Sequence, residues 1–488
     1  MFGGLRLAPH KEAADAPMRR IEAVESLQVS MLQHSGRPAR PVVQVGDRVR
    51  RGDLLGAAAD VRSAPVHAPI DAVVEAIVEQ PSWLPSADAI LHVHLRRTDS
   101  AGAPRCLAPL GECTDAEALR ERVREAGIVG LGGAGFPTAD KLGGDRSVLI
   151  LNGVECEPHI ACDDRLLRED ARAVLGGGRW LARICGAQQV LIAVEDSMHA
   201  AIDALRAVLA DFPGITLRVV PDRYPQGGER QLIATLCGVE VPADGLPRDV
   251  GILVANVATA AATHAAIERG EPLTRRWVSV SGDAVAAPGV FEVPIGLPVA
   301  ELVAAAGGYT ADAVHLLLGG SMMGTALPDD AAPIGKLHNA VTVLRARAGS
   351  TAPALPCIRC GACADACPVR LLPQQLHAFS RAEDDGRLQA QGLFACIECG
   401  CCDPVCPSGI PLTAQFRQAK QRIQLEAVQR VQADTARQRH ELRQQRLLET
   451  EALRAERREA RRQQVTDPIQ AALARARAKA AGEREPPA

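Results

Sequence analysis

Short alternating segments of apolar and polar residues occupy the first part of the chain and predict a small β-rich module. Residues 43–55 alternate and turn twice, at Gly46-Asp47 and Gly52-Asp53, and residues 66–74 repeat the pattern. Strands of this length, separated by Gly-Asp turns, are typical of a compact sandwich or barrel. We expect a leading segment over residues 1–40 and this module over residues 41–105.

From about residue 114 the pattern changes to an alternation of helices and buried strands. Thr114 or Asp115 can cap a helix that ends before Gly127. The strands and helices that follow are predicted at residues 148–151, 164–185, 190–194, 197–211 and 217–220. This alternation indicates an α/β domain with a largely parallel sheet over residues 114–270.

Short strands return after residue 270. They are predicted at residues 277–280, 290–293 and 315–318, with a brief helix near residues 298–306. The pattern indicates a β-grasp insert of the soluble-ligand-binding kind over residues 271–345. A linker rich in Pro and Ala, residues 346–356, follows it.

The end of the chain, residues 412–488, has a composition of its own. It is rich in Gln, Arg, Glu and Ala and has no Gly or Pro before Pro468, which predicts a helix. Its apolar positions keep no heptad, so a self-sufficient coiled coil is disfavoured. Residues 414–488 carry a charge of about +7 within a chain whose formal net charge is −3. A solvated helix and a partner-binding helix both remain open.

The overall composition excludes some classes of protein. Hydrophobic residues make up 47% of the chain, but aromatic residues only 2%, which argues against a protein that stacks nucleic-acid bases on its side chains. No run of 18 apolar residues occurs, and no apolar stretch of signal-peptide length opens the sequence. We expect a cytosolic chain, or one bound to a membrane face through a partner.

Eight of the fifteen cysteines fall in two copies of the spacing C-x2-C-x2-C-x3-C-P. In the bacterial ferredoxin run, three thiolates hold one [4Fe–4S] cluster and the fourth holds the other, so zinc is disfavoured and the module over residues 346–411 should carry two clusters. The predicted metal ligands of the first cluster are Cys357, Cys360, Cys363 and Cys406. Those of the second are Cys396, Cys399, Cys402 and Cys367. Cys401 breaks the regularity and is interpreted as a spare.

A glycine-rich run, Gly130-Leu-Gly132-Gly133-Ala-Gly135, formally matches the dinucleotide-binding fingerprint G-x-G-x-x-G. That fingerprint requires a strand before it and a helix opening from it. Here a helix is predicted to end just before the run, and Phe136-Pro137 follows it, so this interpretation fails. What remains is backbone that can approach a phosphate or a flat ring closely, or simply a structural turn.

Four segments in order resemble the flavin-binding domain of the 51-kDa, NADH-oxidising subunit family of respiratory complex I. They are Gly130–Thr138 with Lys141, Asn152–Pro158, Tyr224–Glu229 and Asn256–Thr259. The resemblance implies FMN, with its phosphate at the glycine run, Asn256 and Thr259, and its ring near Asn152 and Glu155. It implies NAD(H) as the substrate, facing Phe136 and Glu229. The implied cofactor-binding residues are Gly130, Gly132, Gly133, Gly135, Phe136, Lys141, Asn152, Glu155, Gly228, Glu229, Asn256 and Thr259.

The chain departs from that family in two ways. Cys156 interrupts one of that family's acidic pairs, and Gly228 replaces a Glu in the other, so the residues support flavin binding more strongly than contact with NADH. The chain also carries two predicted clusters where that family carries one. As non-functional alternatives, Cys156 and Cys162 are buried small hydrophobic residues, and Asp163 and Asp164 cap the next helix. No acid–base or nucleophilic catalytic residue is needed, and none stands out.

The whole order of domains resembles the C subunit of the Rnf/Rsx ion-translocating electron-transport complex, over residues 1 to about 410. The first module also resembles biotinyl and lipoyl carriers, but no lysine lies between Lys11 and Lys141 to be modified. The fold class implied is therefore multidomain α/β and α+β: a barrel-sandwich hybrid, a flavin domain, a β-grasp insert, a two-cluster ferredoxin module and a charged helical tail.

This second resemblance implies a peripheral electron-input subunit at the cytoplasmic face of the bacterial inner membrane. It would be an NADH-linked translocase subunit, partnered by integral-membrane and iron–sulfur subunits and indirectly by ferredoxin-type carriers, with no nucleic acid. Two alternatives stay open. One is a soluble flavin and iron–sulfur corrinoid reductase, a family that carries the sandwich module after its clusters. The other is a non-catalytic electron relay with a decayed flavin site, against which the intact glycine run and Lys141 argue.

Overall fold

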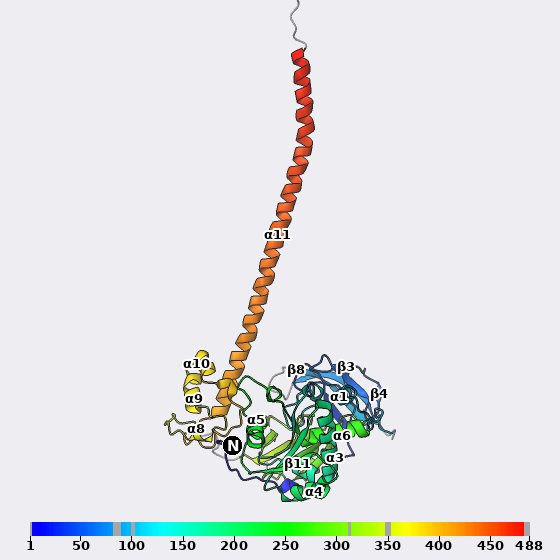
Figure 1. Ribbon diagram of the computed structural model, residues 1–488, viewed down its shortest axis with the longest axis vertical. Helices are drawn as coiled ribbons and strands as arrows, with labels where there is room; N and C mark the ends of the chain where they lie inside the picture. The colour runs from blue at the N-terminus through cyan, green and yellow to red at the C-terminus, as the bar shows by residue number, and fades with distance from the viewer. Residues whose placement is uncertain (1, 82–88, 99–102, 311–313, 347–352, 483–488) are drawn as a thin grey trace, which may run out of the picture. The chain divides into compact units, whose positions relative to one another are not determined.

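The computed structural model describes residues 2–81, 89–98, 103–310, 314–346 and 353–482. The chain divides into two compact units, Met1–Phe416 and Arg417–Ala488 (Figure 1). Residues 347–352 of the predicted linker lie outside the described ranges. Within those ranges, no helix combines the length and the apolar character that a membrane crossing requires.

Two small sheets form the N-terminal sandwich. One has the order β2-β8-β7-β4, and the other the order β3-β5-β6. Their bounds are Ser26–Ser30 (β2), Arg40–Pro41 (β3), Arg48–Val49 (β4), Leu54–Ala57 (β5), Val66–His67 (β6), Ala72–Pro81 (β7) and Ala89–Arg97 (β8). Strand β2 pairs with β8, so the sandwich also draws on residues that the sequence assigned to the leading segment.

A four-stranded parallel sheet of order β11-β10-β9-β12 forms the α/β domain, as expected. Its strands are Val148–Gly153 (β9), Gln189–Glu195 (β10), Ile215–Val220 (β11) and Ile252–Asn256 (β12). The helices are Ala116–Glu125 (α1), Thr138–Lys141 (α2), Cys162–Cys185 (α3), His199–Leu209 (α4), Glu229–Cys237 (α5) and Val257–Glu268 (α6). Helices α3 and α6 approach so closely that a Cβ on Gly177 would collide with Ala260 O. Asn152 and Asn256 are register partners at the carboxyl ends of β9 and β12.

A six-stranded mixed sheet of order β1-β14-β13-β17-β15-β16 carries the β-grasp insert. Its elements are Arg19–Arg20 (β1), Arg275–Ser281 (β13), Gly289–Pro294 (β14), Val299–Ala305 (α7), Val314–Leu318 (β15), Thr325–Leu327 (β16) and Ala340–Arg345 (β17). Helix α7 buries its apolar residues in one core with this sheet and the sandwich. The pairing of β1 with β14 brings the N-terminal segment onto the insert.

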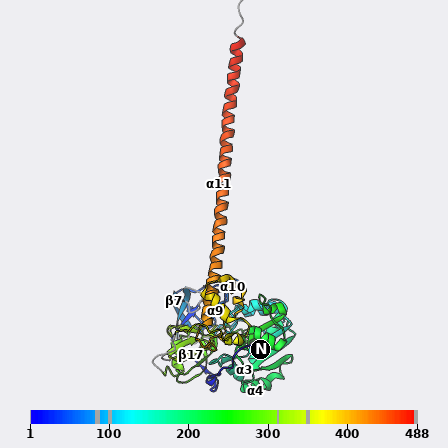
Figure 2. The same cartoon turned by 90° about the vertical axis from the view of Figure 1, so that its left-hand side faces the viewer.

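A short helix, Ala362–Ala366 (α8), lies within the first cysteine run. Pro373–Arg381 (α9) and Asp385–Ala390 (α10) connect the two runs (Figure 2), followed by a 3-10 turn at Leu393–Ala395. The tail is helical as predicted, within α11, Leu412–Gly482, and Pro468 does not interrupt it. Its apolar residues, such as Leu425, Val431 and Leu442, are more than half exposed.

Candidate functional site

The glycine run forms a closed loop between α1 and α2. Gly130 N donates to Phe136 O at 2.8 Å, and Gly135 N donates to Gly130 O at 3.1 Å. Gly133 has a φ of +102°, and a Cβ placed on it would meet nothing within 4 Å, whereas one on Gly135 would collide with Leu337. The backbone at Gly133 therefore faces open space, as the approach of a phosphate or a flat ring would require.

The loop is fastened to the start of α6. Leu131 N donates to Thr259 Oγ1 at 2.9 Å, and the buried Arg276 donates to Leu131 O at 2.8 Å. Asn256 caps α6, because its Oδ1 accepts from Ala258 N at 2.9 Å. The side chain of Thr259 thus holds the loop against the first turn of α6, and Asn256 caps the N-terminus of that helix, where main-chain N–H groups and the helix dipole favour an anion.

Asn152 joins the end of β9 to the loop before α5. Its Nδ2 donates to Gly227 O at 2.9 Å, and its Oδ1 accepts from Val154 N at 3.1 Å. Gly227 N in turn donates to Cys156 Sγ at 3.2 Å. Burial raises the pKa of the Cys156 thiol to about 12, so this thiol stays protonated and acts as a packing group and acceptor.

The two residues assigned to the nicotinamide nucleotide, Phe136 and Glu229, are partly exposed, and so is Lys141, which the resemblance places near the flavin. Lys141 Nζ and Glu229 Oε1 form an ion pair at 2.6 Å, and both side chains are more than one third exposed. Phe136 is 40% exposed. Gly228 is the N-cap of α5, and a Cβ on it would collide with Gln231 Oε1. Glu229 therefore has a cationic partner within the protein.

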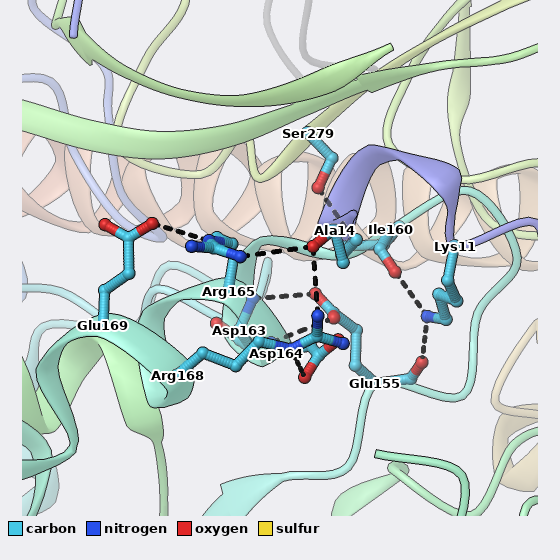
Figure 3. A network of polar contacts seen from close by, with 11 residues as sticks. Lys11, Ala14, Glu155, Ile160, Asp163, Asp164, Arg165, Arg168, Glu169 and Ser279 are labelled. Atoms are coloured by element: carbon cyan, nitrogen blue, oxygen red, sulfur yellow. Dashed lines mark hydrogen bonds and ion pairs between the residues drawn. The ribbon is translucent and has the colours of Figure 1, made fainter. Parts of the chain in front are cut away.

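Glu155 is buried and turned towards α3. Its Oε1 accepts from Asp163 N at 3.0 Å, and its Oε2 accepts from Asp164 N at 3.2 Å (Figure 3). The alternative in which Asp163 and Asp164 cap this helix is wrong: both lie inside its first turn, and the carboxylate that reaches their amides is that of Glu155. Burial raises the pKa of Asp163 to about 7, and the negative charge of Glu155 is the second-largest cause of this rise.

Lys11 was missed by the sequence reasoning. Its ammonium donates to the main-chain oxygens of Glu155 at 2.5 Å and of Ile160 (Figure 3), and to that of Glu157 at 3.1 Å. An ammonium has three N–H donors that can point at three converging carbonyls, a geometry that the planar guanidinium does not match. The composition held a signal for it: only five of the 55 Lys and Arg residues are lysines, so a lysine at a given position is unusual in this chain.

The cysteine runs surround two separate hollows. The first hollow is lined by Cys357, Cys360, Cys363 and Cys406. The second is lined by Cys367, Cys396, Cys399 and Cys402, together with Cys401. Each hollow thus brings together three cysteines of one run and the last cysteine of the other. Four thiols around one hollow are the donor set that a [4Fe–4S] cluster takes.

The second hollow adjoins the α/β domain. Tyr224 donates its hydroxyl to Cys399 O at 2.5 Å, and both residues belong to one apolar cluster that also contacts Cys156 and Met322. Glu157 Oε1 accepts from Met322 N at 2.9 Å. The loop that follows Asn152 therefore reaches the second cysteine run through a single layer of side chains.

Four family models match the chain. They are the Nuo51 FMN-binding domain at residues 123–265, the RnfC barrel sandwich hybrid domain at residues 1–96, the SLBB domain at residues 277–326 and the 4Fe-4S dicluster domain at residues 353–410. The chain thus carries an FMN-binding domain and a two-cluster ferredoxin module, in the predicted order.

Curated relatives match almost the whole chain. The C subunit of the ion-translocating oxidoreductase complex of Pseudomonas aeruginosa is 43% identical, over 98% of this chain and 65% of the relative. The protein of the same name from Salmonella dublin is 41% identical, over 96% of this chain and 68% of the relative. The chain spans less than two thirds of the Pseudomonas relative. Among solved structures, an NAD+-reducing [NiFe]-hydrogenase is 26% identical, with a TM-score of 0.46 over 64% of this chain and 63% of that chain.

Proposed function

Because the chain belongs to the RnfC family, the C subunits of ion-translocating oxidoreductase complexes, we propose that it is the peripheral electron-input subunit of such a complex. It passes electrons between NAD(H), FMN and two [4Fe–4S] clusters. Its partners are integral-membrane and iron–sulfur subunits, with ferredoxin-type carriers beyond them, and it works at the cytoplasmic face of the bacterial inner membrane. FMN supplies the change from two-electron to one-electron transfer.

The observation that carries this proposal is the contact of the second cysteine hollow with the α/β domain at Tyr224 and Cys399. An electron-input subunit needs its first one-electron acceptor beside the flavin site. The layer of Tyr224, Cys156 and Met322 supplies that proximity and excludes water from it. The cluster held by Cys396, Cys399, Cys402 and Cys367 is therefore the first acceptor, and the cluster of Cys357, Cys360, Cys363 and Cys406 the second.

The residues around the glycine loop fit FMN. Open space beside Gly133 lets the backbone approach the ligand. The N-terminus of α6, held by Asn256 and Thr259, receives the phosphate. Asn152, at the adjacent strand end, orients the ring, while Glu155 acts through the fold by fixing the start of α3.

The exposed ion pair of Lys141 and Glu229 belongs to the entry of the dinucleotide. An exposed pair contributes about 0–1 kcal/mol, so a ligand can replace it at little cost. Lys141 would then meet a phosphate, and Glu229 would accept from a hydroxyl of the nucleotide. Phe136 offers an exposed ring beside them.

Cofactor analysis of anaerobically purified protein tests the proposal. We expect one FMN per chain, about eight iron atoms, and reduction of both flavin and clusters by NADH. Co-purification with membrane subunits separates this role from that of a soluble corrinoid reductase. Protein that contains flavin but is reduced by no nicotinamide nucleotide would contradict the NAD(H) assignment.

A further inference from the structure

We propose that the N-terminal arm, residues 2–20, is a strap that sets the spacing between the flavin site and the second cysteine hollow, and that Lys11 is the positioning residue that fastens it. The inference rests on the proposed function, because it concerns the step between those two sites. Neither the arm nor Lys11 belongs to the residues that would touch flavin or clusters.

One end of the arm lies between the α/β domain and the cysteine module. Leu5 exchanges two main-chain hydrogen bonds with Tyr224, at 2.8 and 2.9 Å, and Gly4 N donates to Ala366 O at 2.9 Å. Gly3 passes so close to Cys367 that a Cβ on it would collide with the carbonyl oxygen of that cysteine. Two consecutive residues, Gly4 and Leu5, therefore hold the module of the second hollow and the α/β domain together.

The middle of the arm lies on the loop of residues 155–160, which follows Asn152. Pro9 O accepts from His159 N at 3.1 Å, and the ring of His10 stacks on that of His159 with centroids 4.7 Å apart. Lys11 then closes this contact with three hydrogen bonds to main-chain oxygens of the same loop. The loop is thereby tied to the segment that also touches the cysteine module.

Electrostatics add to the hold of Lys11. Burial raises the pKa of Glu155, of Glu157 and of Glu195, and Lys11 is a positive charge that opposes this rise at each of them. The positive charges of Arg276 and Lys11 likewise oppose the rise in the pKa of Asp163. When these carboxyl groups are ionised they attract the Lys11 ammonium, which the carbonyls also bind. A neutral side chain at this position loses both interactions.

The far end of the arm continues onto other elements. Ala14 O accepts from Arg168 at 3.1 Å (Figure 3), and β1 adds to the sheet of the β-grasp insert. The strap therefore has fixed points on both sides of Lys11. Electron transfer between two sites slows as their separation grows, so release of the middle fixed point should slow transfer from flavin to cluster.

The test compares Lys11→Met with Lys11→Arg and with Arg6→Met in anaerobic holoprotein. Arg6 is exposed on the same arm, and among the described residues its side chain makes no hydrogen bond or ion pair. Arg6→Met therefore removes one positive charge, as Lys11→Met does, without removing a contact. Hydrogen–deuterium exchange reports the Leu5, Tyr224 and His159 amides, and stopped-flow absorbance separates NADH reduction of flavin from bleaching of the clusters.

For Lys11→Met we expect full iron and FMN, unchanged reduction of flavin, faster exchange at the three amides, and slower bleaching of the clusters than in the unaltered protein. Lys11→Arg keeps the charge, but its planar guanidinium does not match the three converging carbonyls, so it should restore only part of the protection and rate. Arg6→Met should match the unaltered protein. Unchanged exchange in Lys11→Met would overturn the strap, and unchanged bleaching despite faster exchange would overturn its positioning role. A wild-type flavin that NADH does not reduce contradicts the proposed function instead, while the exchange data still decide the strap.

Discussion

Replacing Thr259 by Val tests whether the glycine loop is shaped for a flavin. Thr259 is 2% exposed, and its Oγ1 accepts from Leu131 N, in the middle of the loop, at 2.9 Å. Valine has nearly the same shape, so the substitution removes the acceptor without opening a cavity. A buried donor left without its partner costs about 1–3 kcal/mol.

Part of this cost falls on the stability of the flavin-free protein and part on the binding of FMN, and the two parts can be measured separately. Without FMN the loop of Thr259→Val can turn the Leu131 amide towards water, and FMN must then pull it back into an unpaired position. If the whole cost falls on binding, the dissociation constant of FMN rises about 5- to 150-fold. Quenching of FMN fluorescence during titration of flavin-free protein gives this constant, and thermal unfolding gives the remainder of the cost.

Thr263→Val is the matched control. Thr263 is also buried in α6, one turn later, and its hydroxyl donates to Thr259 O at 2.8 Å. Thr263→Val removes a hydroxyl that donates to a helical carbonyl, but it leaves no buried N–H without an acceptor. FMN should therefore bind almost as before. The reasoning is refuted if the two variants weaken FMN equally, or if Thr259→Val lowers only the unfolding temperature.

The cysteine hollows, the buried carboxyl groups and the tail each allow a further test. Cys367→Ser should disturb the cluster of the second hollow, which it lines, and electron paramagnetic resonance of reduced protein should show the first cluster intact; Cys401→Ser is the control that keeps its iron. Because the pKa of Asp163 is raised to about 7, this group's contribution to stability is full at low pH and is lost as pH rises from about 4 to about 7. Asp163→Asn should flatten that part of the unfolding profile, and an unchanged slope would contradict the assignment. Truncation after Phe416 should leave flavin and clusters in place but weaken membrane association, most clearly at raised salt; unchanged, equally salt-sensitive binding would assign docking to residues 1–416.

Local packing places the cut after Phe416 rather than at the end of the cysteine motif. The sequence alone places the end of the cysteine module at residue 411 and the tail over residues 412–488. In the structure, Gln415 Oε1 is 2.7 Å from His377 Nδ1, and Phe416 is 1% exposed and lines the second hollow. The first turn of α11 therefore belongs to the cluster module, and a shorter protein would test the loss of a core residue rather than the loss of the tail.

Local signals predicted the elements well where one segment determines its own conformation. Asp115 was expected as a cap of α1, and its side chain accepts from Glu117 N at 3.0 Å. The parallel strands follow from apolar runs between helices, and the cysteine spacing predicted which four cysteines meet at each hollow. In these cases the interacting groups lie close in sequence, or a known motif spacing specifies which cysteines share a cluster.

Pairings between distant segments were not accessible in this way. Arg19 of β1 lies opposite Phe291 in β14. A strand of two residues has no sequence pattern from which its partner strand could be predicted. Glu155 rather than Asp163 or Asp164 caps α3, because the path of the loop decides which carboxylate reaches the amides. The ion pair of Lys141 and Glu229 joins residues that the sequence had assigned separately to two ligands.

Two of the five lysines, Lys336 and Lys11, hold separate parts of the structure together through main-chain carbonyls. Lys336 of the β-grasp insert is 0% exposed, and its Nζ donates at 2.7 Å both to Pro65 O of the sandwich and to Gly127 O of the α/β domain. Among the described residues its ammonium contacts no carboxylate, and burial lowers its pKa to about 7. An arginine could not release its proton there and would remain a buried charge without a counter-ion. Lys336 and Lys11 therefore share one chemistry: a compact ammonium that several main-chain carbonyls can surround. At Lys336 it joins two domains, and at Lys11 it holds the N-terminal arm on the loop of residues 155–160.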